Sequence, residues 1–201
     1  MPQNAQEWDH RYRQPGYWAG TEPAEFLRDV LPLLPHGTTL DLACGEGRNA
    51  VFLAARGWCV LAVDRSRPAL EKAEVLAREA GVPALWGAPG RLAARSAHPL
   101  TLLETDLESS ALPARQFDVV LCFNYLQRSL LSALPRLLRP HGLLVYETYT
   151  LAQLQFAKGP RNPEFLLRPD ELRVAFPTLE ILFYREIVAG KGIASLLARK
   201  P

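Results

Sequence analysis

The 201-residue sequence contains no apolar stretch that approaches the roughly 18 residues a helix needs to span a bilayer. Its first twenty residues contain Glu7, Asp9, Arg11 and Arg13 but no apolar run, so we expect no signal peptide. It also lacks a charge excess, since 23 basic and 21 acidic residues give a net charge of +2. This balance gives no electrostatic reason to expect binding to nucleic acid or a membrane. We therefore expect a cytoplasmic protein.

Cysteine is scarce as well. The three cysteines, Cys44, Cys59 and Cys122, are odd in number and lack the paired spacing of a metal site. Each lies in an apolar run that is typical of a strand. We expect all three to be small buried side chains in a reducing compartment, with no metal centre.

Strand-like and helix-like segments alternate along most of the chain, and 48% of the residues are hydrophobic. This composition predicts one domain, residues 1–201, with a substantial core. The strands are mostly continuous apolar runs, which is how strands buried on both faces read, so we predict a parallel sheet with helices on both sides. The predicted strands are 38–44, 59–66, 100–107, 117–124 and 143–150, and the predicted helices are 48–57, 67–81 and 129–142, the last interrupted or bent near Pro135.

After residue 150 the pattern changes. A loop leads to a short helix around "PDELRVAF", and then "LEILFYREIV" and "IASLLARK" flank the turn "AGKG". This part predicts a C-terminal antiparallel hairpin. Residues 83–99 contain three prolines and two glycines, and we expect them to be a surface insertion between the second helix and the third strand.

The stretch "LDLACGEGRNAVFLAARG", Leu40 to Gly57, passes from a strand through two glycines into a helix. Glycine lets the backbone approach a ligand, and the N-terminus of the following helix attracts negative charge. Residues 45–50 fit the pattern G-x-G-x-x-A. Taken alone, this pattern suits NAD as well as other nucleotide-like ligands.

Two carboxylates narrow the choice among these ligands. Asp64 ends the second strand, 19 residues after Gly45, where an acid can accept hydrogen bonds from ribose hydroxyls. Asp41 lies just before the glycine turn, where it would repel a pyrophosphate but suit a ligand with a positive centre. S-adenosylmethionine is such a ligand, with a sulfonium and an ammonium group beside a ribose. The structural alternative for Asp41 is a carboxylate that caps backbone N–H groups of the turn.

The segments "LDLACGEGRNAVFLAARG", "VLAVDRS", "ETDLES", "FDVVLCFNYL" and "LLRPHGLLVYETY" together resemble the class I S-adenosylmethionine-dependent methyltransferases. The resemblance runs from about residue 38 to 150 and implies a Rossmann-like, doubly wound sheet of seven strands, mostly parallel, with a C-terminal antiparallel hairpin. The opening "EWDHRYRQPGYWAGTEPAEFL" resembles the tellurite-resistance-type methyltransferases, which act on small molecules. We therefore expect methyl transfer to a small molecule, and no nucleic-acid or membrane partner.

The resemblance also implies a set of cofactor-binding residues. They comprise a glycine loop of Asp41, Ala43, Gly45 and Gly47; Asp64 at the ribose; Arg65, Asp106 and Leu107 around the adenine; and Phe123 and Asn124 at the methionine portion and the methyl group. The N-terminal segment, residues 1–30, carries Trp8, Tyr12, Tyr17 and Trp18 and is expected either to cover the cofactor or to dock on the core.

The acceptor side has three candidate catalytic residues, Tyr125, Glu147 and Arg161. Glu147 at the end of an apolar strand either binds an ammonium group, acts as a base, or caps a backbone group. Arg161 and Lys158 either favour an anionic acceptor or are solvated. Because a thiolate or another soft nucleophile needs no base, and no convincing base is visible, the sequence favours such an acceptor.

Two other functions stay open at this stage. The chain could bind S-adenosylmethionine without catalysing a reaction. It could also be an NAD-dependent oxidoreductase, although no Tyr-Lys or His arrangement with suitable spacing is visible.

Overall fold

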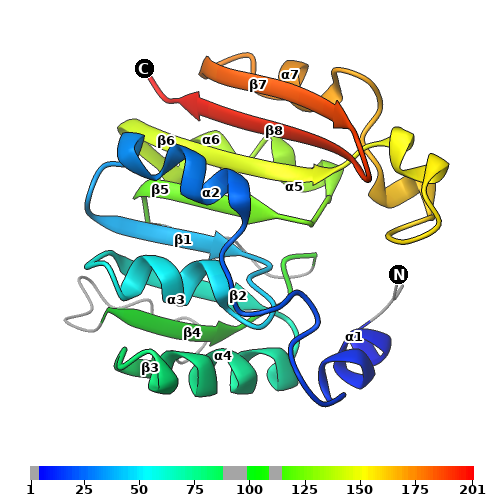
Figure 1. Cartoon of the computed structure of the whole chain (residues 1–201). Helices are drawn as coiled ribbons and strands as arrows, with labels where there is room; N and C mark the ends of the chain where they lie inside the picture. The colour runs from blue at the N-terminus through cyan, green and yellow to red at the C-terminus, as the bar shows by residue number, and fades with distance from the viewer. Residues whose placement is uncertain (1–4, 88–98, 109–114) are drawn as a thin grey trace.

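The computed structural model in Figure 1 describes residues 5–87, 99–108 and 115–201. Its strands form one eight-stranded sheet in the order β3-β4-β2-β1-β5-β6-β8-β7. The strands are β1 (Thr38–Leu42), β2 (Cys59–Asp64), β3 (Ala84–Trp86), β4 (Leu100–Glu104), β5 (Phe117–Phe123), β6 (Leu138–Tyr149), β7 (Glu180–Val188) and β8 (Gly192–Arg199). The first six pair in parallel, whereas β8 pairs antiparallel with both β6 and β7.

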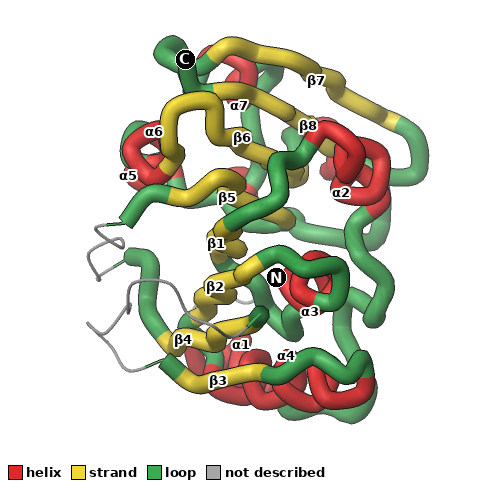
Figure 2. Tube along the Cα trace, turned by 90° about the vertical axis from the view of Figure 1, so that its left-hand side faces the viewer, coloured by secondary structure: helices red, strands yellow, loops and turns green. Residues whose placement is uncertain are grey.

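Helices cover both faces of the sheet, as Figure 2 shows. One face carries α2 (Glu25–Val30), α3 (Arg48–Ala54) and α4 (Arg67–Glu79), and the other carries α5 (Arg128–Leu131), α6 (Leu134–Leu137) and α7 (Glu171–Val174). The remaining helical segments are α1 (Ala5–Tyr12) and the 3-10 turns η1 (Leu31–Leu33), η2 (Leu151–Gln155) and η3 (Pro163–Phe165). No helix among the described residues has the length and apolar content needed to cross a membrane.

The strand order reverses between β1 and β5. From β1 the chain proceeds outward through β2 to β4, and then returns to place β5 on the other side of β1. In such sheets the crevice at the carboxyl ends of the two strands at the reversal is where ligands bind. Helix α1 lies at this end of the sheet, toward which the parallel strands in Figure 1 point.

The parallel sheet and the C-terminal hairpin are therefore confirmed, but the strand count is eight rather than seven. The extra strand is β3, which comes from the segment expected to be a surface insertion. Its three residues pair in parallel with Leu100–Leu102, and Arg67 lies 3.9 Å from the centre of the Trp86 ring. A short apolar run beside an open sheet edge gains backbone hydrogen bonds by pairing with it. The prolines and glycines of the segment had favoured a surface loop instead. The rest of that segment, residues 88–98, lies outside the described residues.

The predicted helix over residues 129–142 is wrong at its C-terminal end. It consists of two short helices, α5 and α6, and Pro135 lies in the first turn of α6. Strand β6 already begins at Leu138, which pairs with Phe117 before a bulge shifts the register. Gly142 in this bulge leaves no room for a side chain, because a Cβ atom would lie 3.0 Å from the carbonyl oxygen of Arg139. The apolar spacing of a helix continued in the sequence, but pairing with β5 determined the structure.

The expectation for the cysteines holds for only one of them. Cys122 is buried in β5, Cys44 is half-buried, and Cys59 is exposed. Cys59 is the first residue of β2, where the strand emerges from a turn, so its apolar neighbours along the sequence do not cover it.

Candidate functional site

A cavity of about 530 Å³ opens at the carboxyl ends of β1 and β5, the place where the strand order reverses. Its walls come from the N-terminal segment, the glycine loop after β1, and the ends of β2, β4, β5 and β6. Gly159, Pro160 and Lys191 close the side next to the C-terminal hairpin. The size is that of an ordinary small-molecule site.

The glycine loop is held by Asp64. The backbone N–H of Gly45 donates to Asp64 Oδ2 at 2.8 Å, and the N–H of Ser66 donates to Oδ1 at 2.9 Å. Asp64 is only 7% exposed. Its carboxylate therefore fixes the path of the loop, and each oxygen still has a lone pair that can accept from a ligand hydroxyl.

The two glycines of the loop have different tasks. Gly45 has φ +55° and lines the cavity, with the Tyr12 hydroxyl close above it. Gly47 has φ +79° and is not among the cavity-lining residues. A Cβ atom on Gly47 would lie 2.5 Å from the Cβ of Ala73, so this glycine lets α3 approach α4. The family resemblance implied that both glycines bind the cofactor; of the two, Gly45 lines the cavity and Gly47 does not.

Asp41 is the most unusual group in the site. It is 1% exposed, lines the cavity, and its Oδ2 has no hydrogen-bond partner among the described residues. Burial, and then the charge of Asp64, raise the pKa of Asp41 to about 7, while Arg48 and the backbone N–H of Ala50 act in the opposite direction. A buried carboxyl oxygen without a donor is costly, and a cation in the cavity would remove that cost.

Arg65, Asp106 and Leu107, which the resemblance assigns to the adenine, line the cavity beyond the ends of β2 and β4. Arg65 lies 3.7 Å from Asp106 and 3.6 Å from Glu108, and its Nε is buried without a hydrogen-bond partner in the described chain. Asp106 also accepts from the N–H of Glu108 at 3.0 Å. This corner is therefore already partly neutralised before any ligand enters.

Phe123 and Asn124 reach the cavity from the end of β5. Asn124 has φ +56°, and its N–H donates to the carbonyl oxygen of Glu147 at 2.8 Å, which ties this turn to β6. Tyr125 also lines the cavity, but its hydroxyl donates to Gln127 at 2.7 Å. Burial raises the pKa of Tyr125, so its hydroxyl stays protonated and is a poor base.

Of the other two catalytic candidates, one is in the cavity wall and one is not. Glu147 lines the cavity at the end of β6, is 7% exposed, and accepts a hydrogen bond from Ser195 Oγ at 2.7 Å. Arg161 is exposed, donates to the carbonyl oxygen of Phe156, and is absent from the cavity wall, as is Lys158. The cation that does line this side is Lys191, in the β7–β8 turn.

The sequence interpretation missed the residues that attach the N-terminal segment. Buried Glu46 accepts from Lys72 Nζ at 2.9 Å and from the N–H of Trp18 at 2.6 Å. Asn49 accepts from the N–H of Ala24 at 2.9 Å, and Arg48 donates to the carbonyl oxygen of Ala19. The sequence signal for these contacts is the polar run "EGRN", which lies inside the glycine motif and was interpreted only through its glycines.

Aromatic side chains of the N-terminal segment form part of the cavity wall. Trp8, Tyr12 and Trp18 line it; Trp8 stacks on Tyr12 with ring centres 5.4 Å apart, and Arg11 lies 4.0 Å from the centre of the Trp18 ring. Tyr17 instead donates to the carbonyl oxygen of Lys72 on α4. The segment thus both docks on the body of the protein and lines the cavity.

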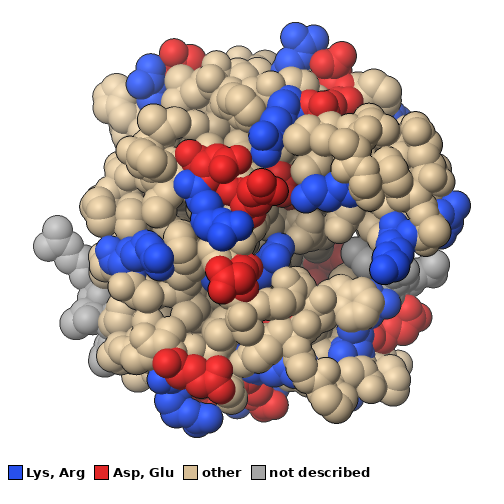
Figure 3. All heavy atoms as spheres, in the orientation of Figure 1, with Lys and Arg blue, Asp and Glu red and all other residues tan. Residues whose placement is uncertain are grey.

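Charges of both signs are interspersed on the face seen in Figure 3. Among the described residues no group of three or more His, Cys, Asp or Glu side chains is placed to hold a metal ion.

A family model described as "Methyltransferase domain" matches residues 40–146, which include the glycine loop and the ends of β1, β2, β4 and β5. The chain belongs to this family. The resemblance to the class I methyltransferases is thereby confirmed, and so is the fold that it implied.

Individual relatives are more distant. Hemagglutinin 1 of Eikenella corrodens is 28% identical over 192 residues, which cover 87% of this chain and 58% of that protein. The chain spans 58% of the length of each of the curated relatives it matches.

Two solved structures share the fold. The N-methyltransferase NodS from Bradyrhizobium japonicum WM9, in complex with S-adenosyl-L-homocysteine, has a TM-score of 0.71 and 15% identity, with 98% of both chains covered. TehB from Haemophilus influenzae has a TM-score of 0.71 and 16% identity, with 92% of this chain and 64% of that one covered.

Proposed function

We propose that residues 1–201 act as one methyltransferase domain that binds S-adenosylmethionine and transfers its methyl group to a small molecule. The observation that carries this proposal is the unpaired, buried Oδ2 of Asp41 in the wall of the cavity. A carboxyl oxygen at this point suits the ammonium or sulfonium group of the cofactor. Membership of the methyltransferase-domain family supports the same conclusion.

The cavity residues fit the cofactor by the chemistry of their side chains. Asp41 would bind the ammonium group, and Asp64 would accept from the ribose hydroxyls while holding Gly45. Asp106 and Leu107 would bind the adenine, with Arg65 at its edge, and Ala43, Phe123 and Asn124 would line the methionine portion. The cofactor supplies an activated methyl group on a positive sulfur.

The protein's own contribution is to align the two reactants and to exclude water, which can lower the barrier by roughly 7–11 kcal/mol. The N-terminal segment suits this role. Trp8, Tyr12 and Trp18 line the cavity, and Glu46 and Lys72 hold the segment against the body of the protein. We propose that these aromatic side chains shield the reacting groups from solvent.

A dehydrogenase is less well supported, because the Asp41 carboxylate would face the pyrophosphate of NAD at the glycine loop. A binding module without catalysis would need a closed acceptor side. The cavity wall instead includes Glu147, Tyr149 and Lys191 as well as Phe123, and we propose that the acceptor binds beside them.

Two acceptor classes remain in competition. A thiol or another soft nucleophile would react without a base, which is the acceptor favoured by the sequence. An amine is favoured by the position of Glu147, a buried carboxylate in the cavity wall.

Calorimetric titration of the protein with S-adenosylmethionine, S-adenosylhomocysteine and NAD tests the proposal. We expect binding of both adenosyl ligands in the micromolar range and none of NAD. Binding of NAD alone would refute the methyltransferase function. Cofactor binding without transfer to any of a broad set of small amines, thiols and alcohols would favour the non-catalytic module.

A further inference from the structure

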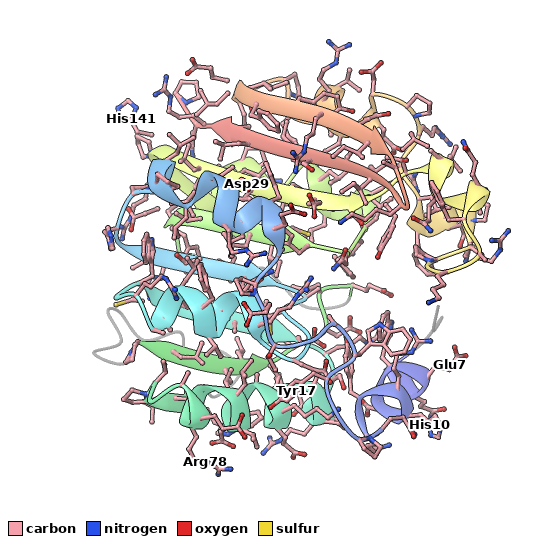
Figure 4. All side chains as sticks on the ribbon, viewed as in Figure 1. Glu7, His10, Tyr17, Asp29, Arg78 and His141 are labelled. Carbon is pink, nitrogen blue, oxygen red and sulfur yellow. The ribbon has the colours of Figure 1, made fainter. Side chains whose placement is uncertain are left out.

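A row of polar side chains crosses the antiparallel part of the sheet. Glu147 on β6 is the register partner of Ser195 on β8, and Ser195 is the partner of Arg185 on β7. Ser195 Oγ donates to Glu147 Oε2 at 2.7 Å, and Arg185 Nε donates to Ser195 Oγ at 3.5 Å. Arg185 also lies 3.7 Å from Asp29 on α2, which is labelled in Figure 4. The row connects the cavity wall with the surface of the molecule.

Burying the polar groups of this row costs free energy unless hydrogen-bond partners compensate for the lost hydration. Ser195 is fully buried and Glu147 nearly so, while their neighbours Ala194, Leu196 and Leu197 on β8 are apolar. A buried carboxylate loses its hydration and must be compensated by donors. The Ser195 hydroxyl supplies one, to Oε2. Oε1 has no hydrogen-bond donor among the residues that the structure describes, and Glu147 is part of the cavity wall.

No basic side chain among the described residues forms an ion pair with the Glu147 carboxylate. Arg48 lines the same cavity and attracts Glu147 electrostatically, but its guanidinium donates to the carbonyl oxygens of Ala19 and Glu22. Asp41, another acid, lines the same cavity. Lys191 also lines this side of the cavity, but at the Glu147 carboxylate itself a thiolate would meet like charge, whereas a nitrogen that donates hydrogen bonds would be attracted to Oε1.

We propose that the methyl acceptor is an amine whose nitrogen is bound by Glu147, and that Ser195 is the positioning residue for that carboxylate. This rests on the proposed methyltransferase function and names its substrate class. The lone pair of the neutral amine forms the N–C bond to the methyl group, and the electron pair of the broken C–S bond stays on sulfur. The positive charge thus moves from sulfur to nitrogen, where the Glu147 carboxylate stabilises it.

Matched pairs of probes test this in protein saturated with S-adenosylhomocysteine. Propylamine, 2-phenylethylamine and tryptamine are each titrated beside the alcohol of the same skeleton, with 2-phenylethanethiol as the sulfur probe. We expect at least one amine to bind about tenfold more tightly than its alcohol near neutral pH. Glu147→Gln should abolish this difference and leave the affinity for S-adenosylhomocysteine unchanged.

Variants of the row separate positioning from simple damage to the sheet. Ser195→Ala should reduce the amine preference severalfold, and Ser195→Thr, which keeps a hydroxyl, should restore it. Thr148→Val is the matched control, because Thr148 is equally buried in β6 but faces the other side of the sheet. Its amine preference should equal that of the wild type.

Each other outcome overturns the proposal. If no amine binds more tightly than its alcohol, if the thiol is preferred, or if the preference survives in Glu147→Gln, the acceptor is not an amine bound by Glu147. If S-adenosylhomocysteine itself does not bind, the methyltransferase function falls together with this proposal, so the two failures are distinguishable.

Discussion

The two ends of the cavity are built in different ways. At the cofactor end, the side chains come mainly from residues 41–65 and 105–124. Two acids there already have partners within the protein, since Asp64 accepts from Gly45 and Asp106 contacts Arg65. At the acceptor end, the wall combines residues 18–20 and 23–25 with Glu147, Tyr149, Gly159, Pro160 and Lys191. Here Glu147 has a single protein donor, Ser195, and Lys191 has no ion pair within the described residues.

The difference separates cofactor binding, which is common to the family, from acceptor binding, which is specific to this chain. The cofactor end starts from a strand, a glycine loop and a helix that follow each other in the chain, and the contacts of Gly45 with Asp64 and of Gly47 with Ala73 preorganise it. The acceptor end depends on four distant parts of the chain, of which residues 18–25 are hydrogen-bonded to Glu46, Arg48 and Asn49. This is why the cofactor can be argued from a family and the acceptor needs the particular side chains of this chain.

The largest effect should come from Asp64→Ala. It removes two hydrogen bonds to a charged acceptor, worth about 3–5 kcal/mol together, and with them the shape of the glycine loop. Calorimetry should show a loss of S-adenosylhomocysteine affinity of at least about a hundredfold. Glu147→Gln, at the other end, is the control and should bind that ligand normally. Equal losses in both variants would show that the two ends are not independent.

Gly47→Ala should destabilise the fold at the cofactor end. The new Cβ would meet Ala73 at 2.5 Å and the residue would keep φ +79°, so we expect a loss of about 3 kcal/mol in the free energy of unfolding. Gly57→Ala is the matched control, since φ there is +93° but nothing lies within 4 Å. It should cost only about 1 kcal/mol. Denaturant unfolding measures both, and equal costs would argue against close packing of α3 on α4.

The pH dependence of stability should report on Asp41. Its pKa is about 7 in the folded protein and near 4 when unfolded, so the folded state retains the proton longer. Stability should therefore fall as the pH rises from about 4 to about 7 and stay lower above that, by about 4 kcal/mol. Unfolding at several pH values should show this slope in the wild type but not in Asp41→Asn. A saturating ligand with an ammonium group should flatten it, and an unchanged slope in the variant would show that another group titrates.

The smallest effect is expected from a change at the contact that holds the N-terminal segment, which contributes to both ends of the cavity. Lys72→Met removes the partner of Glu46 and the donor to the carbonyl oxygens of Gln14 and Gly16. We expect about 1 kcal/mol, seen as a severalfold loss of ligand affinity and faster amide exchange in residues 13–24. Arg78→Met, at an exposed position near the other end of α4, is the control (Figure 4). Equal exchange in both variants would contradict a role for Lys72 in holding the segment.

The sequence by itself determined the parallel sheet, the C-terminal hairpin, and the glycine loop between Asp41 and Asp64. These follow from apolar runs, glycines and helix ends, which act over a few neighbouring residues. Tertiary structure decided that Asp64 holds the loop as well as lining the cavity, that Gly47 allows α3 to pack against α4, and that Arg161 lies outside the cavity wall. It also placed Ser195 on Glu147, 48 residues away in the chain. Such contacts depend on strand register and helix packing between distant segments, and no local pattern of residues encodes them.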